Sequence, residues 1–345
     1  MQQSEILSRP TNGRVHLNVL SNSAIACYRA CPRQFKYRYV MLRRPRRASE
    51  ALRFGALIHV GLNAWWNEPS DASDRYSAAV HAMRERAEAR PEDADPFELI
   101  KAEELIRGYS VRWGDEGYET IAVELTFDVP LVNPETGRAS RTYRVQGAID
   151  AIVRRGGKVF HVEHKTTSQD IGLGADYWRR VSALDPQVST YQSALRALGY
   201  EDVETLYDVI HKVALRPQKA TPEAQRKYTK EGRLYANQRE TDETPEEFRL
   251  RVREHIAANP ERYYARGPVV RLEQDEREHA GDVWQTAAMI RMSENSGHWP
   301  RNPGACERFH RLCDYFDVCS GMASIDDDSR FRTAEHAHEE LIKEV

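Results

Sequence analysis

Hydrophobic residues recur along this chain with two different periods, and the change between them outlines the expected elements. Between residues 21 and 113 apolar side chains lie three or four positions apart, as in Phe54, Ile58 and Leu62, which predicts helices. Over residues 121–129 apolar and mostly polar residues alternate, which predicts a strand. The same criteria predict strands over 141–153, 158–166, 206–213 and near 269–272, and helices over 186–198, from 244 onward and over 274–292.

Capping residues and turns refine this division. Ser21 or Ser23 can cap a first helix, which is expected to continue through Tyr39. Thr244 is followed by a proline and, three residues on, by Glu247, a typical helix start. The chain is thus divided into six regions: a leader (1–20), an N-terminal helical region (21–115), a strand-rich core (116–215), an insertion with C-terminal helices (216–300), a cysteine cluster (301–322) and a polar tail (323–345). The polar tail is expected to be partly disordered.

Composition limits the class of protein. The chain has 345 residues, of which 40% are hydrophobic and 30% charged, with a net charge of -3. No apolar run approaches the roughly 20 residues that a membrane-spanning helix needs. The first 17 residues lack the apolar centre of a signal peptide, so a cytoplasmic location is expected, with no membrane partner.

Positive charge is concentrated near the N-terminus. Residues 29–53 contain nine lysines and arginines against one acid, Glu50, and Phe35, Tyr37 and Tyr39 are interleaved among them. One interpretation is a surface that binds phosphates and stacks on bases. The other is a solvated helix face followed by a basic loop.

A hairpin over residues 145–167 carries the candidate chemistry. Gly156 and Gly157 form its turn, Asp150 lies near the end of its first strand, and Glu163 and Lys165 lie on its second. Residues two apart share one face of a strand, so Glu163 and Lys165 point the same way. The plainer interpretation of these two residues is a surface salt bridge.

Two carboxylates converging at a strand end favour a hard cation such as Mg²⁺. The backbone carbonyl of His164, between the acid and the lysine, can add a further oxygen ligand. The lysine beside such an ion can position an attacking water or balance charge that develops on a phosphate. The pattern therefore predicts hydrolysis of phosphodiester bonds.

Four motifs resemble those of the PD-(D/E)XK nuclease superfamily, in its RecB-type branch. In chain order they are the pairs Gly55 and His59, Gly147 and Asp150, Glu163 and Lys165, and Gln187 and Tyr191. The resemblance implies an α/β fold with a restriction-endonuclease-like mixed β-sheet core flanked by helices. It also implies a metal-dependent DNA exonuclease that acts on single-stranded DNA ends.

The resemblance implies a role for each site residue as well. The metal, Mg²⁺ or Mn²⁺, would be held by His59, Asp150, Glu163 and the His164 carbonyl. Lys165 would assist the attacking water. Gln187 and Tyr191 would contact DNA or orient the lysine. Glu124, on the preceding strand, lies near the metal or is an ordinary exposed acid.

Five cysteines complete the candidate chemistry. Three of them, Cys306, Cys313 and Cys319, lie within fourteen residues, a density typical of metal binding. Disulfides are not expected in a reducing cytosol. Cys31 begins a Cys-Pro-x-x-Phe motif that resembles iron–sulfur members of the superfamily, the AddB-type and CRISPR-associated nucleases.

That resemblance implies a [4Fe-4S] cluster held by Cys31, Cys306, Cys313 and Cys319, with Cys27 as a spare. The cluster would close the C-terminal cysteines onto the N-terminal helix. The spacing departs from the family's, because six residues separate Cys306 from Cys313 where two are usual. Zn²⁺ held by Cys306, His310, Cys313 and Cys319 is therefore an alternative.

A protein without catalysis is the remaining alternative. It would be a zinc- or cluster-stapled nucleic-acid-binding module that acts in recombination or spacer capture. The sequence contains no G-x-x-x-x-G-K-[ST] loop, so a helicase partner, if one takes part, would be a separate chain.

Overall fold

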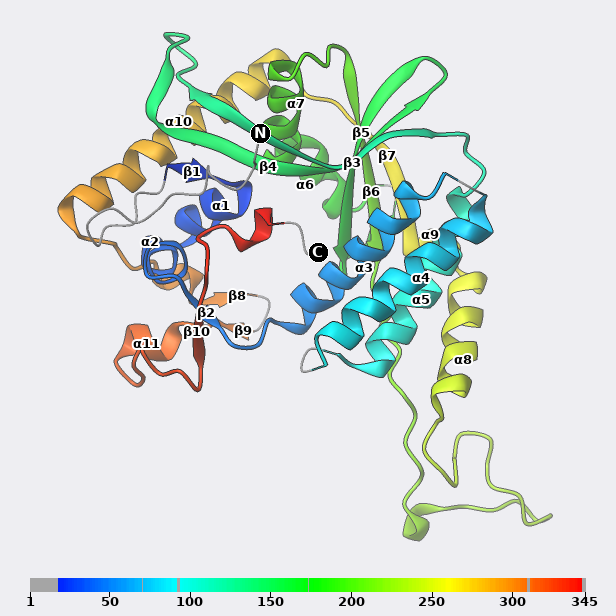
Figure 1. Cartoon of the computed structure of the whole chain (residues 1–345). Coiled ribbons are helices and arrows are strands. Elements are labelled where there is room, and N and C mark those ends of the chain that lie inside the picture. Colours follow the sequence, from blue (N-terminus) through cyan, green and yellow to red (C-terminus); the bar gives the residue numbers. More distant parts are fainter. Residues whose placement is uncertain (1–17, 70, 92–93, 173, 309–310, 343–345) are drawn as a thin grey trace.

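A mixed β-sheet between two layers of helices forms the centre of the molecule (Figure 1). The computed structural model describes residues 18–69, 71–91, 94–172, 174–308 and 311–342. In those residues the predicted α/β class and the mixed sheet flanked by helices are confirmed. The six strands are β1 (Val19–Leu20), β3 (Glu119–Val132), β4 (Ala139–Arg155), β5 (Lys158–Thr167), β6 (Val203–His211) and β7 (Tyr264–Val269).

The long strand β4 organises this sheet. One of its edges pairs with β3 along most of its length, in antiparallel fashion. The opposite edge pairs first with β1, in parallel at residues 144–145, and later with β5, in antiparallel at residues 151–155. Residues 146–150 therefore have no strand partner on this edge among the described residues. β6 adds to β5 in parallel, and β7 adds to β6 in antiparallel.

Helices cover both faces of the sheet (Figure 1). α3 (Glu50–Asn67) and α5 (Pro96–Trp113) pack against Val162 and Ile210 of the sheet in one apolar core. A second core holds Ile152 against helices from both ends of the chain. The other helices are α1 (Asn22–Ala30), α2 (Pro32–Phe35), α4 (Ala72–Ala89), α6 (Asp176–Leu184), α7 (Pro186–Ala197), α8 (Pro245–Ala258), α9 (Pro260–Tyr263), α10 (Glu273–Ser296) and α11 (Phe316–Ser320).

The N-terminal helix is shorter than predicted. Cys31 takes an extended conformation, with φ -161° and ψ 111°, and separates α1 from α2. Pro32 explains the break, because a proline disfavours helical geometry at the residue before it and has no N–H to continue the helix. The predicted single helix through Tyr39 is therefore wrong. A wide helical turn over residues 36–40 completes the segment.

The polar C-terminal segment is also more ordered than expected. β10 (Phe331–Thr333) pairs in antiparallel fashion with β2 (Arg43–Pro45), so this segment runs back to the N-terminal region. A short 3-10 turn over residues 339–341 follows. The stretch 216–243 lies outside the sheet as an arm below α8 in Figure 1. No helix of the described chain is long and apolar enough to cross a membrane.

Candidate active site

Asp150 lies where β4 and β5 separate. The two strands pair as far as Ala151 and Val162 and then diverge. Oδ2 of Asp150 accepts the backbone N–H of His164 at 2.7 Å, and Oδ1 lies 3.5 Å from Nδ1 of His59. Burial by itself would raise the pKa of Asp150. Nearby positive charge, above all that of His59, outweighs burial and holds this pKa well below its usual range. The opening of the sheet thus holds a carboxylate beside an imidazole.

Glu163 and Lys165 form an ion pair beneath this opening. Glu163 is 0% exposed, and its Oε1 accepts a hydrogen bond from Nζ of Lys165. Burial raises the pKa of Glu163, although Lys165 opposes the rise. Burial disfavours the charged lysine, but Glu163 above all raises the pKa of Lys165, which stays protonated. The pair exists as the sequence suggested, but its glutamate is fully buried and its lysine only partly exposed.

Gln187 and Tyr191 hold the lysine from the opposite side. Both lie on α7, one turn apart, and Nε2 of Gln187 donates to the Tyr191 hydroxyl at 2.7 Å. Oε1 of Gln187 accepts from Nζ of Lys165 at 2.6 Å. A Cβ at Gly147 would lie 2.5 Å from Cζ of Phe127 and 3.2 Å from Cε1 of Tyr191, so only glycine leaves room there. Two of the predicted motifs thus form one hydrogen-bonded row, Glu163–Lys165–Gln187–Tyr191.

The His164 side chain points away from this row. Its Nδ1 lies 3.0 Å from Oδ2 of Asp208, which is 1% exposed and also accepts from the Tyr109 hydroxyl at 2.7 Å. Nε of Arg266 donates to Oδ1 of the same aspartate at 3.1 Å. Only the backbone of His164 therefore belongs to the site. The buried network around Asp208 was not anticipated, because its members are far apart in sequence.

A cavity of about 400 Å³ opens over the site. Its walls include His59, Asp150, Gln187 and Tyr191, whereas the fully buried Glu163 does not reach its surface. Glu340 and Leu341 also line this cavity, which was not expected. They belong to the C-terminal segment, which lies between α1 and α3 in Figure 1. No pattern in the acidic tail predicted this position.

Glu124 lines the same cavity. Its carboxylate accepts from Nδ2 of Asn63, one helical turn after His59 on α3. The backbone at Glu124 has a φ of 49°, a conformation that costs free energy for a residue with a side chain. The sequence left two interpretations of Glu124, a position near the metal site or an ordinary exposed acid. The structure favours the position beside the site.

The comparison with protein families agrees with this arrangement. The sequence model of the PD-(D/E)XK nuclease superfamily matches residues 19–320. The chain belongs to this superfamily. Among curated proteins, no sequence matches it.

Fifteen solved chains match this PD-(D/E)XK protein in structure. The crystal structure of SSO0001 covers 82% of this chain and 79% of its own, at 14% identity and a TM-score of 0.31. A protein from Eubacterium rectale, described as a candidate exonuclease, covers 88% of this chain and 94% of its own, at 10% identity and a TM-score of 0.45.

PD-(D/E)XK nucleases generally use divalent metals such as Mg²⁺ or Mn²⁺. Oε2 of Glu163 fits such an ion, because it is a buried carboxylate oxygen with no hydrogen-bond partner among the described residues. An adjacent cation would satisfy this oxygen and favour its ionised form. In the described chain, however, no three His, Cys, Asp or Glu side chains are arranged to hold an ion as they stand.

Four cysteines line a separate cavity of about 190 Å³: Cys31, Cys306, Cys313 and Cys319. The backbone N–H of Cys313 donates to the Cys306 carbonyl at 2.7 Å, which joins the first two C-terminal cysteines. Cys27 does not line the cavity, and burial raises the pKa of its thiol to about 12. His310, the histidine of the zinc alternative, lies outside the described residues.

Much of the basic N-terminal segment is buried or paired, although Arg46 and Arg47 are exposed. Phe35, Tyr37 and Tyr39 are all buried, so the base-stacking interpretation is wrong for them. Arg43 pairs with Asp326 and Asp328 of the C-terminal segment. The side chain of Arg44 is only 4% exposed and pairs with Glu339 and Glu340. The solvated-face alternative also fails for these arginines, since an acidic segment covers them.

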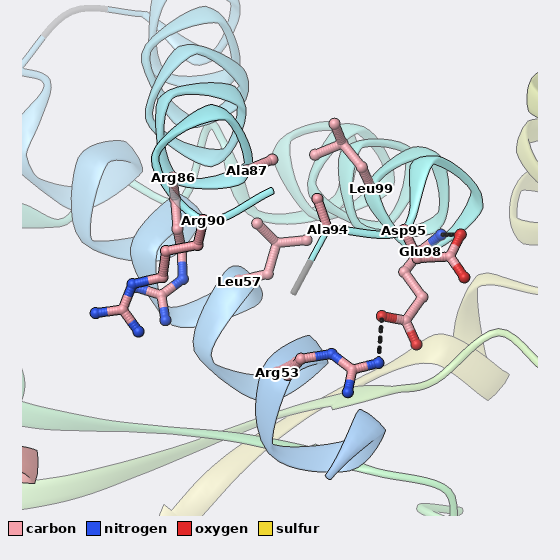
Figure 2. A pocket seen from close by; sticks show the side chains of 9 residues that line it. All are labelled: Arg53, Leu57, Arg86, Ala87, Arg90, Ala94, Asp95, Glu98 and Leu99. Carbon is pink, nitrogen blue, oxygen red and sulfur yellow. Dashed lines mark hydrogen bonds and ion pairs between the residues drawn. The ribbon is translucent and has the colours of Figure 1, made fainter. Parts of the chain in front are cut away.

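A small cavity also lies between α3, α4 and α5 (Figure 2). It has a volume of only about 50 Å³, and an ion pair between Arg53 and Glu98 borders it. None of the predicted site residues lines it. The 400 Å³ cavity over Asp150 is therefore the better candidate for the substrate.

Proposed function

We propose that this PD-(D/E)XK protein is a metal-dependent exonuclease that hydrolyses phosphodiester bonds at single-stranded DNA ends. The observation that carries the proposal is the row from Glu163 through Lys165 to Gln187, beside Asp150 at the opening of the sheet. Its buried, unpaired carboxylate oxygen and its protonated lysine are suited to a cation and a phosphate, respectively.

The proposed ligands of Mg²⁺ or Mn²⁺ are His59, Asp150, Glu163 and the carbonyl of His164. When bound, the ion would act as a Lewis acid and promote formation of the attacking hydroxide. Lys165 would donate to the phosphate or to the attacking water, and Gln187 would fix the direction of its ammonium group. Tyr191 would in turn fix Gln187. Preference for single-stranded ends is supported by the resemblance to iron–sulfur exonucleases alone, because the interleaved aromatic residues are buried.

We also propose that Cys31, Cys306, Cys313 and Cys319 hold a [4Fe-4S] cluster. Support comes from the single cavity that these four residues share, although Cys31 and Cys306 are 275 positions apart along the chain. A cluster there would close a very long loop and reduce the entropy that the unfolded chain gains. Zn²⁺ with His310 remains the competing occupant.

The test begins with protein purified without oxygen. Its visible spectrum and its iron, sulfide and zinc contents are measured first, and single-stranded DNA is then added with Mn²⁺. We expect a brown protein that degrades DNA only with the metal. A colourless protein with one zinc and no cleavage would instead support the non-catalytic binding module.

Two variants on one strand make the catalytic test specific. Lys165→Ala is expected to abolish cleavage while DNA binding is largely retained. Lys158→Ala is the matched control, because Lys158 begins the same strand but pairs with Glu204 in an exposed position. Retained cleavage in a clean Lys165→Ala preparation would refute the proposed mechanism.

A further inference from the structure

A second large cavity lies at the carboxyl ends of the parallel strands β5 and β6. It has a volume of about 500 Å³ and shares no lining residue with the catalytic cavity. Thr167 and Ser168, which directly follow the catalytic strand segment, form one wall. Arg308 and Arg311, from the segment between the C-terminal cysteines, also line the cavity. We call this cavity the strand-end groove.

Positive charge dominates the strand-end groove. Lys212, Arg308 and Arg311 line it, whereas Asp314 is the only acidic lining residue in the described part of the chain. Asp314 lies 3.8 Å from Arg311, and both side chains are about half exposed, so solvent weakens their attraction. Ser49, the cap of α3, brings the positive end of an eighteen-residue helix to the same groove.

Lys212 lines the groove and forms no ion pair with a described residue. Its backbone N–H donates to the Thr167 carbonyl at 2.8 Å, which joins the ends of the two strands. Its Nζ contacts only the Ala51 carbonyl, at 3.2 Å, and the face of Phe54 among the described residues. Partial burial lowers the pKa of this lysine, although the charges of Glu50 and Glu98 oppose the shift, so an anion in the groove would further stabilise its charge.

The strand-end groove and the catalytic site lie along the same helix. Ser49 lines the groove and His59 lines the catalytic cavity, ten residues further along α3. Ten residues of helix rise about 15 Å. A stacked, B-form strand rises about 3.4 Å per nucleotide along its axis, so for such a strand that distance corresponds to about four nucleotides.

We propose that the strand-end groove binds the sugar-phosphate backbone of a nucleic-acid strand about four nucleotides from the bond that is cut. This inference rests on the proposed nuclease function and adds to it a binding site for the uncut part of the substrate. Three cations, the hydroxyls of Thr167 and Ser168 and the start of α3 would contact phosphates, which carry no sequence information. The groove would therefore bind strands of any sequence.

Binding is tested by fluorescence anisotropy with 20-nucleotide single strands of DNA and of RNA in EDTA, so that cleavage cannot interfere. The variant is Lys212→Gln/Arg308→Gln/Arg311→Gln. Each lost phosphate contact reduces the salt slope by about 0.7 for single strands, so three reduce it by about 2, equivalent to about 100-fold weaker binding at 0.1 M salt. The matched control removes the same charge from the distant arm: Lys227→Gln/Lys230→Gln/Arg233→Gln.

The expected result is a loss of affinity and salt slope in the groove variant that the arm variant does not share. The strand, DNA or RNA, that shows the larger loss is the one the groove accepts. Equal affinities of the two variants would overturn the inference. Because Lys212→Gln removes a contact to α3, Arg308→Gln alone provides a second test, with an expected slope change of about 0.7.

Cleavage separates this inference from the proposed function. With Mn²⁺, the groove variant should cut a 20-nucleotide strand with a raised KM and an unchanged kcat. A three-nucleotide substrate, too short to reach the groove, should be cut equally by both proteins. If wild-type protein binds strands through the groove but cuts none of them, the proposed function fails and the groove stands.

Discussion

Replacing Gly147 by alanine should reduce both stability and activity, for a reason of space alone. Gly147 does not have a positive φ, so alanine could adopt its backbone conformation. The new Cβ would, however, lie 2.5 Å from Cζ of Phe127 and 3.2 Å from Cε1 of Tyr191. Both rings are about 95% buried and contact each other with centroids 5.6 Å apart, so neither can move freely.

The size of the effect follows from the cost of overpacking. Extra methylene groups in a well-packed core typically destabilise a protein by about 1–3 kcal/mol. A shifted Tyr191 ring would also move its hydroxyl, which Gln187 contacts at 2.7 Å, and thereby Lys165. Since misplacement by about 1 Å can cost about 100-fold in rate, we expect kcat to fall by at least about tenfold.

The assay combines thermal unfolding with initial rates of DNA cleavage. Gly281→Ala is the control, because its Cβ would meet nothing closer than 4.0 Å on α10, where alanine should stabilise the helix by about 1 kcal/mol. In the Gly147→Ala background, Phe127→Leu should restore part of the activity by removing the nearest ring. An unchanged melting temperature together with an unchanged rate in Gly147→Ala would refute this reasoning.

Three further predictions concern other parts of the molecule. Asp208→Asn should reduce the free energy of unfolding by up to about 3–5 kcal/mol in chemical denaturation, because the buried Arg266 loses its fully buried charge partner and keeps the partly exposed Glu116. Glu340→Gln should lower stability at pH 7 but not at pH 2. Burial raises the pKa of Glu340, but hydrogen bonds, above all the one with His338, outweigh burial and lower this pKa from 4.5 to about 2. The ionised Glu340 therefore stabilises the fold by up to about 3 kcal/mol above pH 4.5, and this stabilisation is lost as the pH falls through 2. Equal stability differences at both pH values would contradict this assignment. Cys313→Ser should lose bound metal and unfold at a lower temperature than wild type, and an equally stable, metal-free variant would exclude a structural role for the cluster.

Local signals predicted the elements around the site well. Pro186 marks the start of α7, and the capping box of Thr244 and Glu247 marks the start of α8, both as expected. Alternation and a glycine turn predicted the hairpin of β4 and β5 to within two residues at each end. These features depend on neighbours in sequence, so the sequence is sufficient to predict them.

Contacts between distant segments were not predictable in the same way. The basic segment suggested a surface, yet Arg44 is buried against Glu339 and Glu340, almost 300 residues away. A long-range ion pair leaves no periodic signal in either partner. The same reason applies to Glu340 at the catalytic cavity and to Arg266 beside Asp208.

The sequence by itself determined which candidate groups the chain carries: the carboxylates, the lysine and the cysteines. The spacing of the carboxylates and the lysine resembles that of the superfamily, whereas the cysteine spacing departs from it. The sequence also determined that Glu163 and Lys165 share a face, because side chains alternate along a strand. Only the tertiary structure decided that β4 and β5 separate at Asp150, that Gln187 reaches Lys165, and which cations remain exposed to a substrate. Those outcomes depend on packing between segments far apart in the chain, which fixes burial and hence the charge that each group can carry.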